Sequence, residues 1–224
     1  MQIKVSRKTF FIFDLDDTLF YELDFLKSAY KNISKQLSAI INKDIYEDML
    51  ELYHKKENTF NWLTDKYKNV APFLTNEWLL KEYREHIPTI ALSDETSNFL
   101  QKARSCAIPM GLITDGRSLT QRNKLKALDI DKYFTDIIIS EEFGSEKPDE
   151  RNYLYFVNKY PGKEFYFFGD NTSKDFIVPI KLGWTLICIK NSGYSIHLQD
   201  LDKLPILSDK ISNFNEINIK PLIA

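Results

Sequence analysis

Two short apolar runs in this chain end abruptly in carboxylates, one near the start of the sequence and one near the end. The first is FIFDLDDTLF at residues 11–20 and the second is FFGDNTSKD at residues 167–175. If both runs form strands that end at the same edge of a sheet, they bring together Asp14, Asp16, Asp170 and Asp175. Two carboxylates about 4 Å apart repel each other by roughly 4 kcal/mol at an effective dielectric constant near 20. A fold that gathers four of them indicates a hard divalent cation, which takes oxygen ligands and in phosphate chemistry is usually Mg²⁺.

The part of the chain after residue 93 alternates between helical and strand patterns. Ser93 is a typical N-cap before an amphipathic stretch, and short apolar runs of strand length follow at intervals. The predicted helices cover residues 93–104, 118–130, 148–160 and 173–183, and the predicted strands cover residues 108–114, 136–140, 164–170 and 184–190. Pro179 lies inside the last helix, so we expect that helix to kink or to begin late. The alternation predicts an α/β fold: a doubly wound parallel sheet with helices on both faces. Residues 191–224 would cover the edge of this sheet.

Residues 20–92 have a different pattern. Apolar side chains recur three and four residues apart, from Leu23 through Leu37 and again from Ile45 to Leu52, and the segment contains no glycine. This spacing is typical of amphipathic helices. We therefore predict an all-helical cap domain of residues 20–92, inserted into a core domain that comprises residues 1–19 and 93–224. The crevice between the two would hold the site.

The composition excludes several classes of protein. The chain has 224 residues, a net charge of −2 and a pI of about 6.0, so it lacks the basic footprint of a nucleic-acid-binding protein. No stretch approaches the roughly 20 apolar residues of a membrane span, and the N-terminus does not resemble a signal peptide. Cys106 and Cys188 are the only cysteines. We expect a cytoplasmic monomer or homodimer without disulfides and without nucleic-acid or membrane partners.

Other polar residues follow the predicted strands at positions that suit phosphate binding. In an open parallel sheet, ligands bind beyond the carboxyl ends of the strands. Thr114, Asp115 and Gly116 end one strand, and Lys147 lies in the loop after the next. A hydroxyl, a turn of backbone amides, a cation and a metal can together hold and neutralise a phosphoryl group. Of the two closely spaced aspartates, one can attack phosphorus while the other transfers protons.

The motifs DLDDTLF, LITDG, SEKPD and GDNTSKD, in that order, resemble the four motifs of the haloacid dehalogenase (HAD) superfamily of phosphohydrolases. The resemblance covers roughly residues 8–20 and 93–190, and the helical insert resembles the C1 cap of the superfamily's subfamily I. It implies that Asp14 is the nucleophile and that Asp16 is the general acid and base. The namesake dehalogenases lack an acid/base aspartate at the position of Asp16, so its presence favours hydrolysis of phosphate esters.

The same resemblance implies the remaining site residues. The substrate-binding residues would be Thr114, Asp115, Gly116 and Lys147, of which Thr114 and Lys147 would contact the phosphate and Asp115 could serve a structural role. The Mg²⁺ ligands would be Asp14, the backbone carbonyl of Asp16, Asp170 and Asp175. Asp175 matches a position that binds the metal directly in some members and indirectly in others. Glu150 stands where many relatives have proline, which leaves Lys147 in place.

These features predict an Mg²⁺-dependent phosphatase that hydrolyses a small phosphomonoester, such as a sugar phosphate, through an aspartyl-phosphate intermediate. A phosphomutase or phosphotransferase on the same fold is one alternative, and a non-catalytic phosphate-binding regulatory protein is another. A receiver domain also combines acids, a threonine and a lysine. Its acidic residues all precede that threonine and lysine, however, and it has no helical insert.

Overall fold

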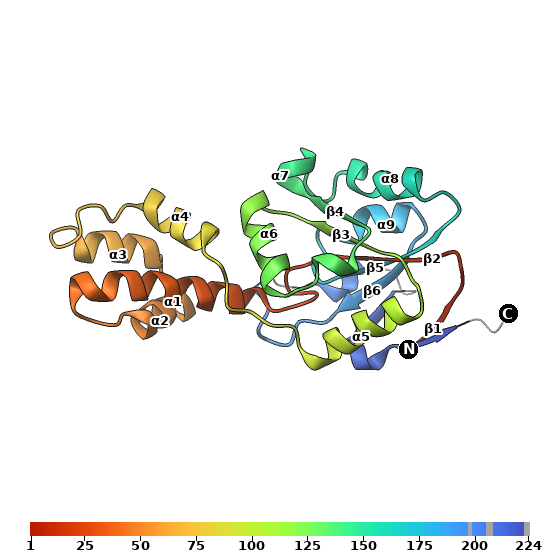
Figure 1. Cartoon of the computed structure of the whole chain (residues 1–224), viewed down its shortest axis with the longest axis horizontal. Coiled ribbons are helices and arrows are strands. Elements are labelled where there is room, and N and C mark those ends of the chain that lie inside the picture. The colour runs from red at the N-terminus through yellow and green to blue at the C-terminus, as the bar shows by residue number, and fades with distance from the viewer. Residues whose placement is uncertain (197–198, 205–207, 222–224) are drawn as a thin grey trace.

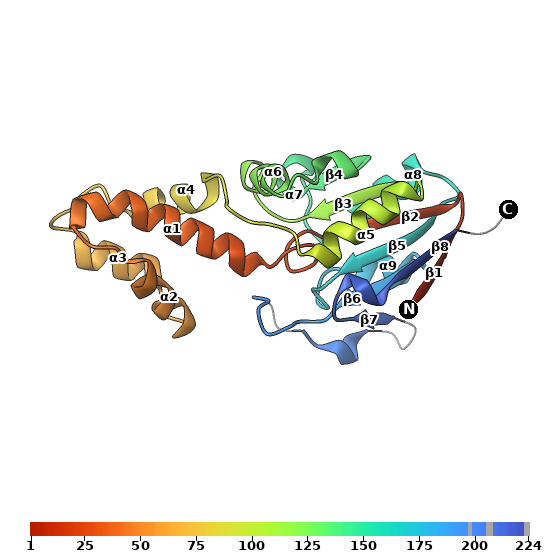
Figure 2. The same ribbon diagram turned by 60° about the horizontal axis from the view of Figure 1, so that its bottom comes forward.

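The computed structural model describes residues 1–196, 199–204 and 208–221, which form two lobes. The larger lobe surrounds a parallel sheet, and a smaller helical lobe extends from one end of it (Figures 1 and 2). The chain passes into the helical lobe just before α1 (Glu22–Ile41) and returns through the segment after α4 (Asn76–Glu85). It then continues the larger lobe with α5 (Asp94–Ser105).

The main sheet is parallel throughout. In spatial order its strands are β4 (Asp136–Ile139), β3 (Met110–Thr114), β2 (Thr9–Phe13), β5 (Glu164–Gly169), β6 (Thr185–Ile189) and β7 (Asp209–Ile211). The chain first builds from β2 outward to β4 and then restarts on the other side of β2 with β5. This reversal makes a topological switch point between β2 and β5, where open α/β sheets bind ligands. The predicted doubly wound parallel sheet is confirmed.

Both faces of the sheet are covered, as the uninterrupted apolar sequence of β2 requires. All five residues of β2 are buried, which is typical of a central parallel strand. Phe11 and Phe13 pack in one cluster with Phe99 of α5, whereas Phe10 and Ile12 pack in another with Phe156 of α8 (Glu150–Lys159). The short helix α9 (Ile177–Lys181) lies over the second face with α8. The sheet therefore holds the ends of β2, β3 and β5 in fixed relation to one another.

The helical lobe has an apolar core of its own. Besides α1 and α4 it contains α2 (Tyr46–His54) and α3 (Thr59–Tyr67). Side chains at the predicted three- and four-residue spacing meet at its centre, among them Ile33, Leu37, Met49, Leu63 and Leu79. Residues 21–92, all of which the structure describes, contain helices and no strand. The division of the chain into a cap and a core domain at these residues remains our proposal.

The structure differs from the sequence-based expectations mainly around the later elements. The helix expected at 173–183 is only α9, and it begins late, as the position of Pro179 indicated. The helix expected from residue 148 begins after Asp149, whose side chain accepts the Arg151 amide as an N-cap. Strand β7 covers the sheet edge beside β6, as expected for the closing segment.

A few further elements were not anticipated from the sequence. These are the two-stranded sheet of β1 (Gln2–Val5) and β8 (Asn218–Pro221), the four-residue helix α7 (Ser140–Phe143) and the 3₁₀ turns η1 (Asp131–Tyr133), η2 (Leu201–Lys203) and η3 (Phe214–Glu216). Helix α6 (Ser118–Ala127) ends three residues earlier than expected. No helix in the described ranges combines the length and apolar character of a membrane span.

Candidate active site

A small polar chamber lies at the carboxyl ends of β2, β3 and β5. It has a volume of about 120 Å³. It brings together residues that are far apart in the sequence: Asp14, Asp16, Glu22, Thr114, Asp115, Lys147, Asp170, Asn171, Lys174 and Asp175. Of the residues predicted to form the site, all except Gly116 line this chamber, and Gly116 lines the larger cavity beside it.

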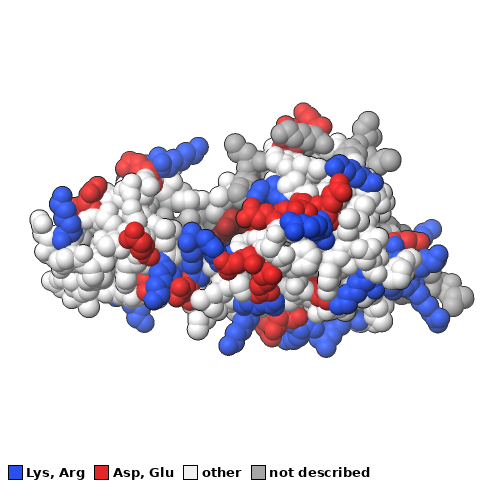
Figure 3. Space-filling view, turned by 90° about the horizontal axis from the view of Figure 1, so that it is seen from above, with Lys and Arg blue, Asp and Glu red and all other residues white. Residues whose placement is uncertain are grey.

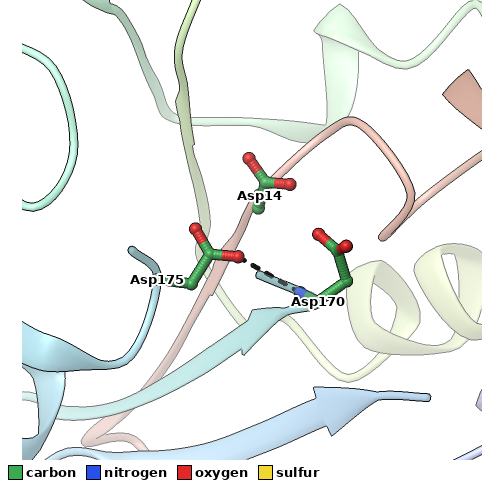
Figure 4. Close-up of side chains that lie close together, drawn as sticks. All are labelled: Asp14, Asp170 and Asp175. Atoms are coloured by element: carbon green, nitrogen blue, oxygen red, sulfur yellow. Dashed lines mark hydrogen bonds between the residues drawn. The ribbon is translucent and has the colours of Figure 1, made fainter. Parts of the chain in front are cut away.

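Three buried carboxylates form the floor of this chamber. Ligand oxygens of Asp14, Asp170 and Asp175 all lie within 4.8 Å of one another, and the side chains point into one shared space (Figure 4). Burial, reinforced by the neighbouring carboxylates, raises the pKa of Asp14 to about 8 and that of Asp170 to about 9. Without a bound cation, the floor therefore disfavours full ionisation of its carboxyl groups.

Asp175 shapes the floor with both of its carboxylate oxygens. Oδ2 accepts hydrogen bonds from the backbone N–H groups of Asp170, at 3.1 Å, and Asn171, at 2.9 Å, while Oδ1 contacts Lys147 Nζ at 2.7 Å. This fold-back brings Asp175 so close to Gly169 that a Cβ there would lie 2.6 Å from Asp175 Oδ2. Gly169 is thus required by the close approach of a side chain rather than by its own backbone conformation.

Lys147 is the buried cation of the floor. Its Nζ lies 2.5 Å from Asp14 Oδ1 and bridges that carboxylate to Asp175. Burial opposes the lysine charge, but the two aspartates outweigh it and raise the pKa of Lys147 well above the ordinary value. Asp115 fixes the loop that carries this lysine, because its Oδ1 accepts the Lys147 backbone N–H at 2.9 Å. One ammonium group shared in this way cannot neutralise three ionised carboxylates.

The floor fits a hard divalent cation. Asp170 Oδ2 is fully buried and has no hydrogen-bond partner in the described part of the chain, and a buried carboxylate oxygen left in that state is costly unless a cation is bound. Thr18 Oγ lies 3.3 Å from Asp14 Oδ2 and 3.5 Å from Asp170 Oδ1, so it adds a further oxygen. An all-oxygen set suits Mg²⁺ or Ca²⁺ rather than a metal that prefers sulfur or imidazole.

Asp16 has different surroundings from Asp14, although only Leu15 separates them. Its carboxylate is partly buried and lies outside the three-carboxylate cluster. Oδ1 lies 2.7 Å from Lys124 Nζ, and Oδ2 accepts a hydrogen bond from Gln121 Nε2 at 2.9 Å. Its expected contribution to the metal is through the backbone carbonyl, and that contribution stays a prediction.

Thr114 and Gly116 are both engaged by neighbouring side chains. Thr114 Oγ accepts a hydrogen bond from Gln121 Nε2 at 2.6 Å, and the Gly116 N–H donates to Ser140 Oγ at 2.9 Å. Gly116 has φ 140°, a conformation that glycine adopts readily. Because the Thr114 oxygen accepts the hydrogen bond from Gln121, the Thr114 hydroxyl hydrogen does not point toward Gln121. This hydrogen therefore remains available for donation to a phosphate oxygen.

Sequence reasoning did not single out Thr18, Gln121, Lys124 or Gly169 for these roles. Gln121 and Lys124 are three residues apart on α6 and so share one helix face. A polar pair on a helix is more often solvated, and nothing in the sequence distinguished this one. Only the packing of α6 against the end of β2 buries it.

A larger cavity of about 850 Å³ adjoins the chamber, and both lobes contribute to it. The helical lobe supplies Glu22, Phe25, Tyr83 and Arg84. Burial, together with Asp16, raises the pKa of Glu22 to about 7.

The larger lobe lines its side of this cavity with exposed ion pairs, including Arg117–Glu141 and Arg151–Asp149. Figure 3 shows acidic and basic side chains adjoining on this face, above α6, α7 and α8.

The chain resembles known proteins in sequence. The model of the haloacid dehalogenase-like hydrolase family matches residues 11–189. A glyceraldehyde 3-phosphate phosphatase of Methanocaldococcus jannaschii is 27% identical over 195 residues, covering 82% of this chain and 85% of that protein. The protein of the same name from Methanopyrus kandleri is 25% identical over 228 residues, covering 91% and 90%.

Solved structures of related fold cover nearly the whole chain. A HAD hydrolase from Bacillus subtilis, solved bound to magnesium, superposes with a TM-score of 0.63 at 20% identity and covers 94% of this chain and 97% of its own. A HAD phosphatase from Thermococcus onnurineus gives a TM-score of 0.58 at 21% identity, covering 93% and 95%. At these sequence identities the structural similarity supports the fold. The matched regions include both lobes of the chain.

Proposed function

Because this chain belongs to the haloacid dehalogenase-like hydrolase family, we propose that it is an Mg²⁺-dependent phosphatase of small phosphorylated metabolites that acts through an aspartyl phosphate. One observation carries the proposal: the buried Asp14 carboxylate is held by the Lys147 ammonium directly beside Asp170. A nucleophile, a phosphate-neutralising cation and a metal ligand thus converge on a space large enough for one phosphoryl group.

In the first step, an Asp14 carboxylate oxygen attacks phosphorus. The bond from phosphorus to the ester oxygen breaks, and Asp16 supplies the proton that the leaving oxygen takes up. Lys147 and the Thr114 hydroxyl hold the phosphoryl oxygens. In the second step, Asp16 removes a proton from water, the water oxygen bonds to phosphorus, and the bond to Asp14 breaks. Inorganic phosphate and the original carboxylate result.

We assign the metal site to Asp14, Asp170, the Asp16 backbone carbonyl and Asp175, with Mg²⁺ as the ion. When bound, the cation would neutralise the floor and stabilise negative charge that develops on the phosphoryl oxygens. The buried Asp170 Oδ2, which has no hydrogen-bond partner among the described residues, supports a metal ligand at that position. Asp175 already uses both oxygens to hold Lys147 and two backbone amides, which favours a supporting role over direct ligation.

We further propose that residues 20–92 form a cap on a core of residues 1–19 and 93–224, and that the cavity between them holds the organic part of the substrate. The curated relatives are named glyceraldehyde 3-phosphate phosphatases. A triose phosphate or a similarly small sugar phosphate is therefore our leading substrate class. Glu22 and Arg84 would contact it from the cap side, because both line the shared cavity.

The test is phosphate release from a panel of glyceraldehyde 3-phosphate, other sugar phosphates, nucleotides and p-nitrophenyl phosphate. Each substrate is assayed with Mg²⁺ and with a chelator, and Asp14→Asn is assayed beside the unaltered protein. We expect metal-dependent release that is lost in Asp14→Asn. Product analysis in the presence of sugar acceptors separates hydrolysis from phosphoryl transfer. A folded, Mg²⁺-binding protein that releases phosphate from nothing in the panel would contradict the proposal.

A further inference from the structure

The carboxylate of Asp16 is held at both of its oxygens by one helix of the core. Lys124 Nζ lies 2.7 Å from Oδ1, and Gln121 Nε2 donates to Oδ2 at 2.9 Å. The same Gln121 amide nitrogen donates to Thr114 Oγ. A carboxylate has about four lone-pair positions, so two remain for a reacting oxygen. The plane of the carboxylate is thereby fixed while part of its acceptor capacity still faces the chamber.

Lys124 is an unusual residue to find in this position. The residue is only 3% exposed, and Asp16 is its ion-pair partner in the described part of the chain. Its Nζ lies 4.5 Å from the ring centroid of Phe25 and 5.8 Å from that of Phe20, at the root of the helical lobe. A buried lysine charge is retained only where a partner compensates for its lost hydration, and aromatic faces contribute to that compensation.

Helix α6 also contacts the helical lobe directly. Thr120 Oγ donates to the Arg84 carbonyl at 2.9 Å, and Asn123 Nδ2 donates to the carbonyls of Glu85 and His86 at 3.1 and 3.2 Å. Residues 120 and 123 therefore hold the end of α4, while residues 121 and 124 hold Asp16. One short helix connects the position of the helical lobe to the position of this carboxylate.

We propose that Lys124 is a positioning residue that fixes the Asp16 carboxylate for both of its proton transfers. The inference rests on the proposed function, in which Asp16 protonates the leaving oxygen and later deprotonates water. Lys124 lines the outer cavity beside Asp16, but in this scheme it contacts neither the phosphoryl group nor the metal. It acts by preventing rotation of the carboxylate, and small errors in the placement of a general acid or base are costly to rate.

The two steps of the reaction allow this role to be tested with p-nitrophenyl phosphate. Its leaving group departs as a stable anion and has little need of a proton, so the first step does not depend on Asp16. Hydrolysis of the aspartyl phosphate still requires a base. A misplaced Asp16 should therefore slow the second step selectively, and aspartyl phosphate should accumulate. Rapid-quench and stopped-flow measurements give the first-turnover and steady-state rates separately.

The variants are Lys124→Met, which keeps the stem and removes the charge, Lys124→Gln as a polar alternative in case the first fails to fold, and Lys124→Arg as the conservative replacement. Asp16→Asn serves as the reference. Lys126→Met is the matched control, because Lys126 is exposed on the same helix. Thermal unfolding with and without Mg²⁺ establishes that each variant is folded and still binds the metal.

For Lys124→Met we expect steady-state turnover to fall about 10- to 100-fold, as for loss of other supporting contacts. We expect the first turnover to change less than about threefold, since that step needs no acid with this substrate. Lys124→Arg should recover much of the rate, and Lys126→Met should match the unaltered protein. Equal losses in both steps, or no loss in either, would overturn the inference. If the unaltered protein turns over no substrate, the proposed function itself has failed.

Discussion

The floor of the small polar chamber and the cavity outside it are built on different principles. The floor comes entirely from the larger lobe, where the segments after β2 and β5 and the loop before α8 bury Asp14, Lys147, Asp170 and Asp175. The outer cavity combines residues of both lobes, and four of its charged groups lie in the exposed ion pairs Arg117–Glu141 and Arg151–Asp149. Exposed pairs contribute little to stability and are easily rearranged, whereas buried ones are strongly interdependent.

Because of this difference, we expect effects on the reaction rate to be separable from effects on substrate selectivity. A change in the floor should disturb stability, metal binding and turnover together, because the side chains there are one another's ion-pair and hydrogen-bond partners. A change among the exposed residues of the outer cavity should disturb the choice of substrate alone. The four predictions below test that contrast.

The largest effect should follow Lys147→Met. Removing the ammonium leaves Asp14 and Asp175 buried without their cation, and loss of one partner of a buried ion pair typically costs about 3–5 kcal/mol. We expect a destabilisation of that size without metal, partial recovery with Mg²⁺, and loss of phosphatase activity. Denaturant unfolding and phosphate release measure these. Lys174→Met is the control, because Lys174 lines the same chamber but is half exposed. An equal loss of stability in both variants would contradict the contrast.

Stability without metal should fall as pH rises. The pKa values of Asp14 and Asp170 are raised from 3.8 to about 8 and about 9 in the folded state. Between those limits the folded protein binds more protons than the unfolded chain, so the free energy of unfolding decreases with increasing pH. In a chelator we expect this loss between about pH 4 and pH 9, and stabilisation by Mg²⁺ should grow over the same range.

Asp170→Asn provides the control for that pH dependence. It removes one of the groups whose pKa is raised, so it should reduce the fall in stability and abolish most of the Mg²⁺ effect, while Asp14 and Glu22 still titrate. Thermal and denaturant unfolding across the pH range measure both. Metal-free stability that rises steadily from pH 5 to about 8 would show that these carboxylates are not held as the structure has them.

Gly169→Ala should have an intermediate effect. The added Cβ would lie 2.6 Å from Asp175 Oδ2 and 2.9 Å from Asp175 Cβ, so Asp175 must move and release its backbone partners. Overpacking of this kind typically costs about 1–3 kcal/mol. We also expect the Mg²⁺ concentration for half-maximal activity to rise.

Gly111→Ala is the matched control for that substitution. Gly111 lies within β3, and a Cβ there would collide with the ring of Phe156 on α8. Both variants should lose stability, and only Gly169→Ala should weaken the Mg²⁺ response. A weakened response in both would mean that general loss of packing, rather than displacement of Asp175, explains the result.

The smallest effect should come from the outer cavity. Arg84 lies on α4, is exposed, and has no ion-pair partner within 4 Å among the residues that the structure describes. We expect Arg84→Ala to raise KM by about 2- to 10-fold with little change in kcat or stability, the pattern of lost uniform binding. Steady-state kinetics on the best substrate measure this. A large fall in kcat would place Arg84 among the groups that act on the reaction itself.

The sequence by itself determined much of this protein. Apolar runs of strand length alternating with helical patterns predicted the parallel sheet, and the absence of glycine with three- and four-residue spacing predicted the helices between residues 20 and 92. The carboxylates that follow β2 and β5 could be expected to meet, because parallel strands present their carboxyl ends at one edge. These inferences succeed because periodicity and strand direction are local properties of the chain.

Only the tertiary structure decided which polar side chains are buried and which partner each one has. Lys124 and Lys126 are alike in sequence, yet the first is buried against Asp16 and the second is exposed. Gly169 gives no local sign that Asp175 will fold back onto it. The physical reason is that burial and charge pairing depend on what a residue meets across the fold, which a periodic pattern along one helix or strand does not encode.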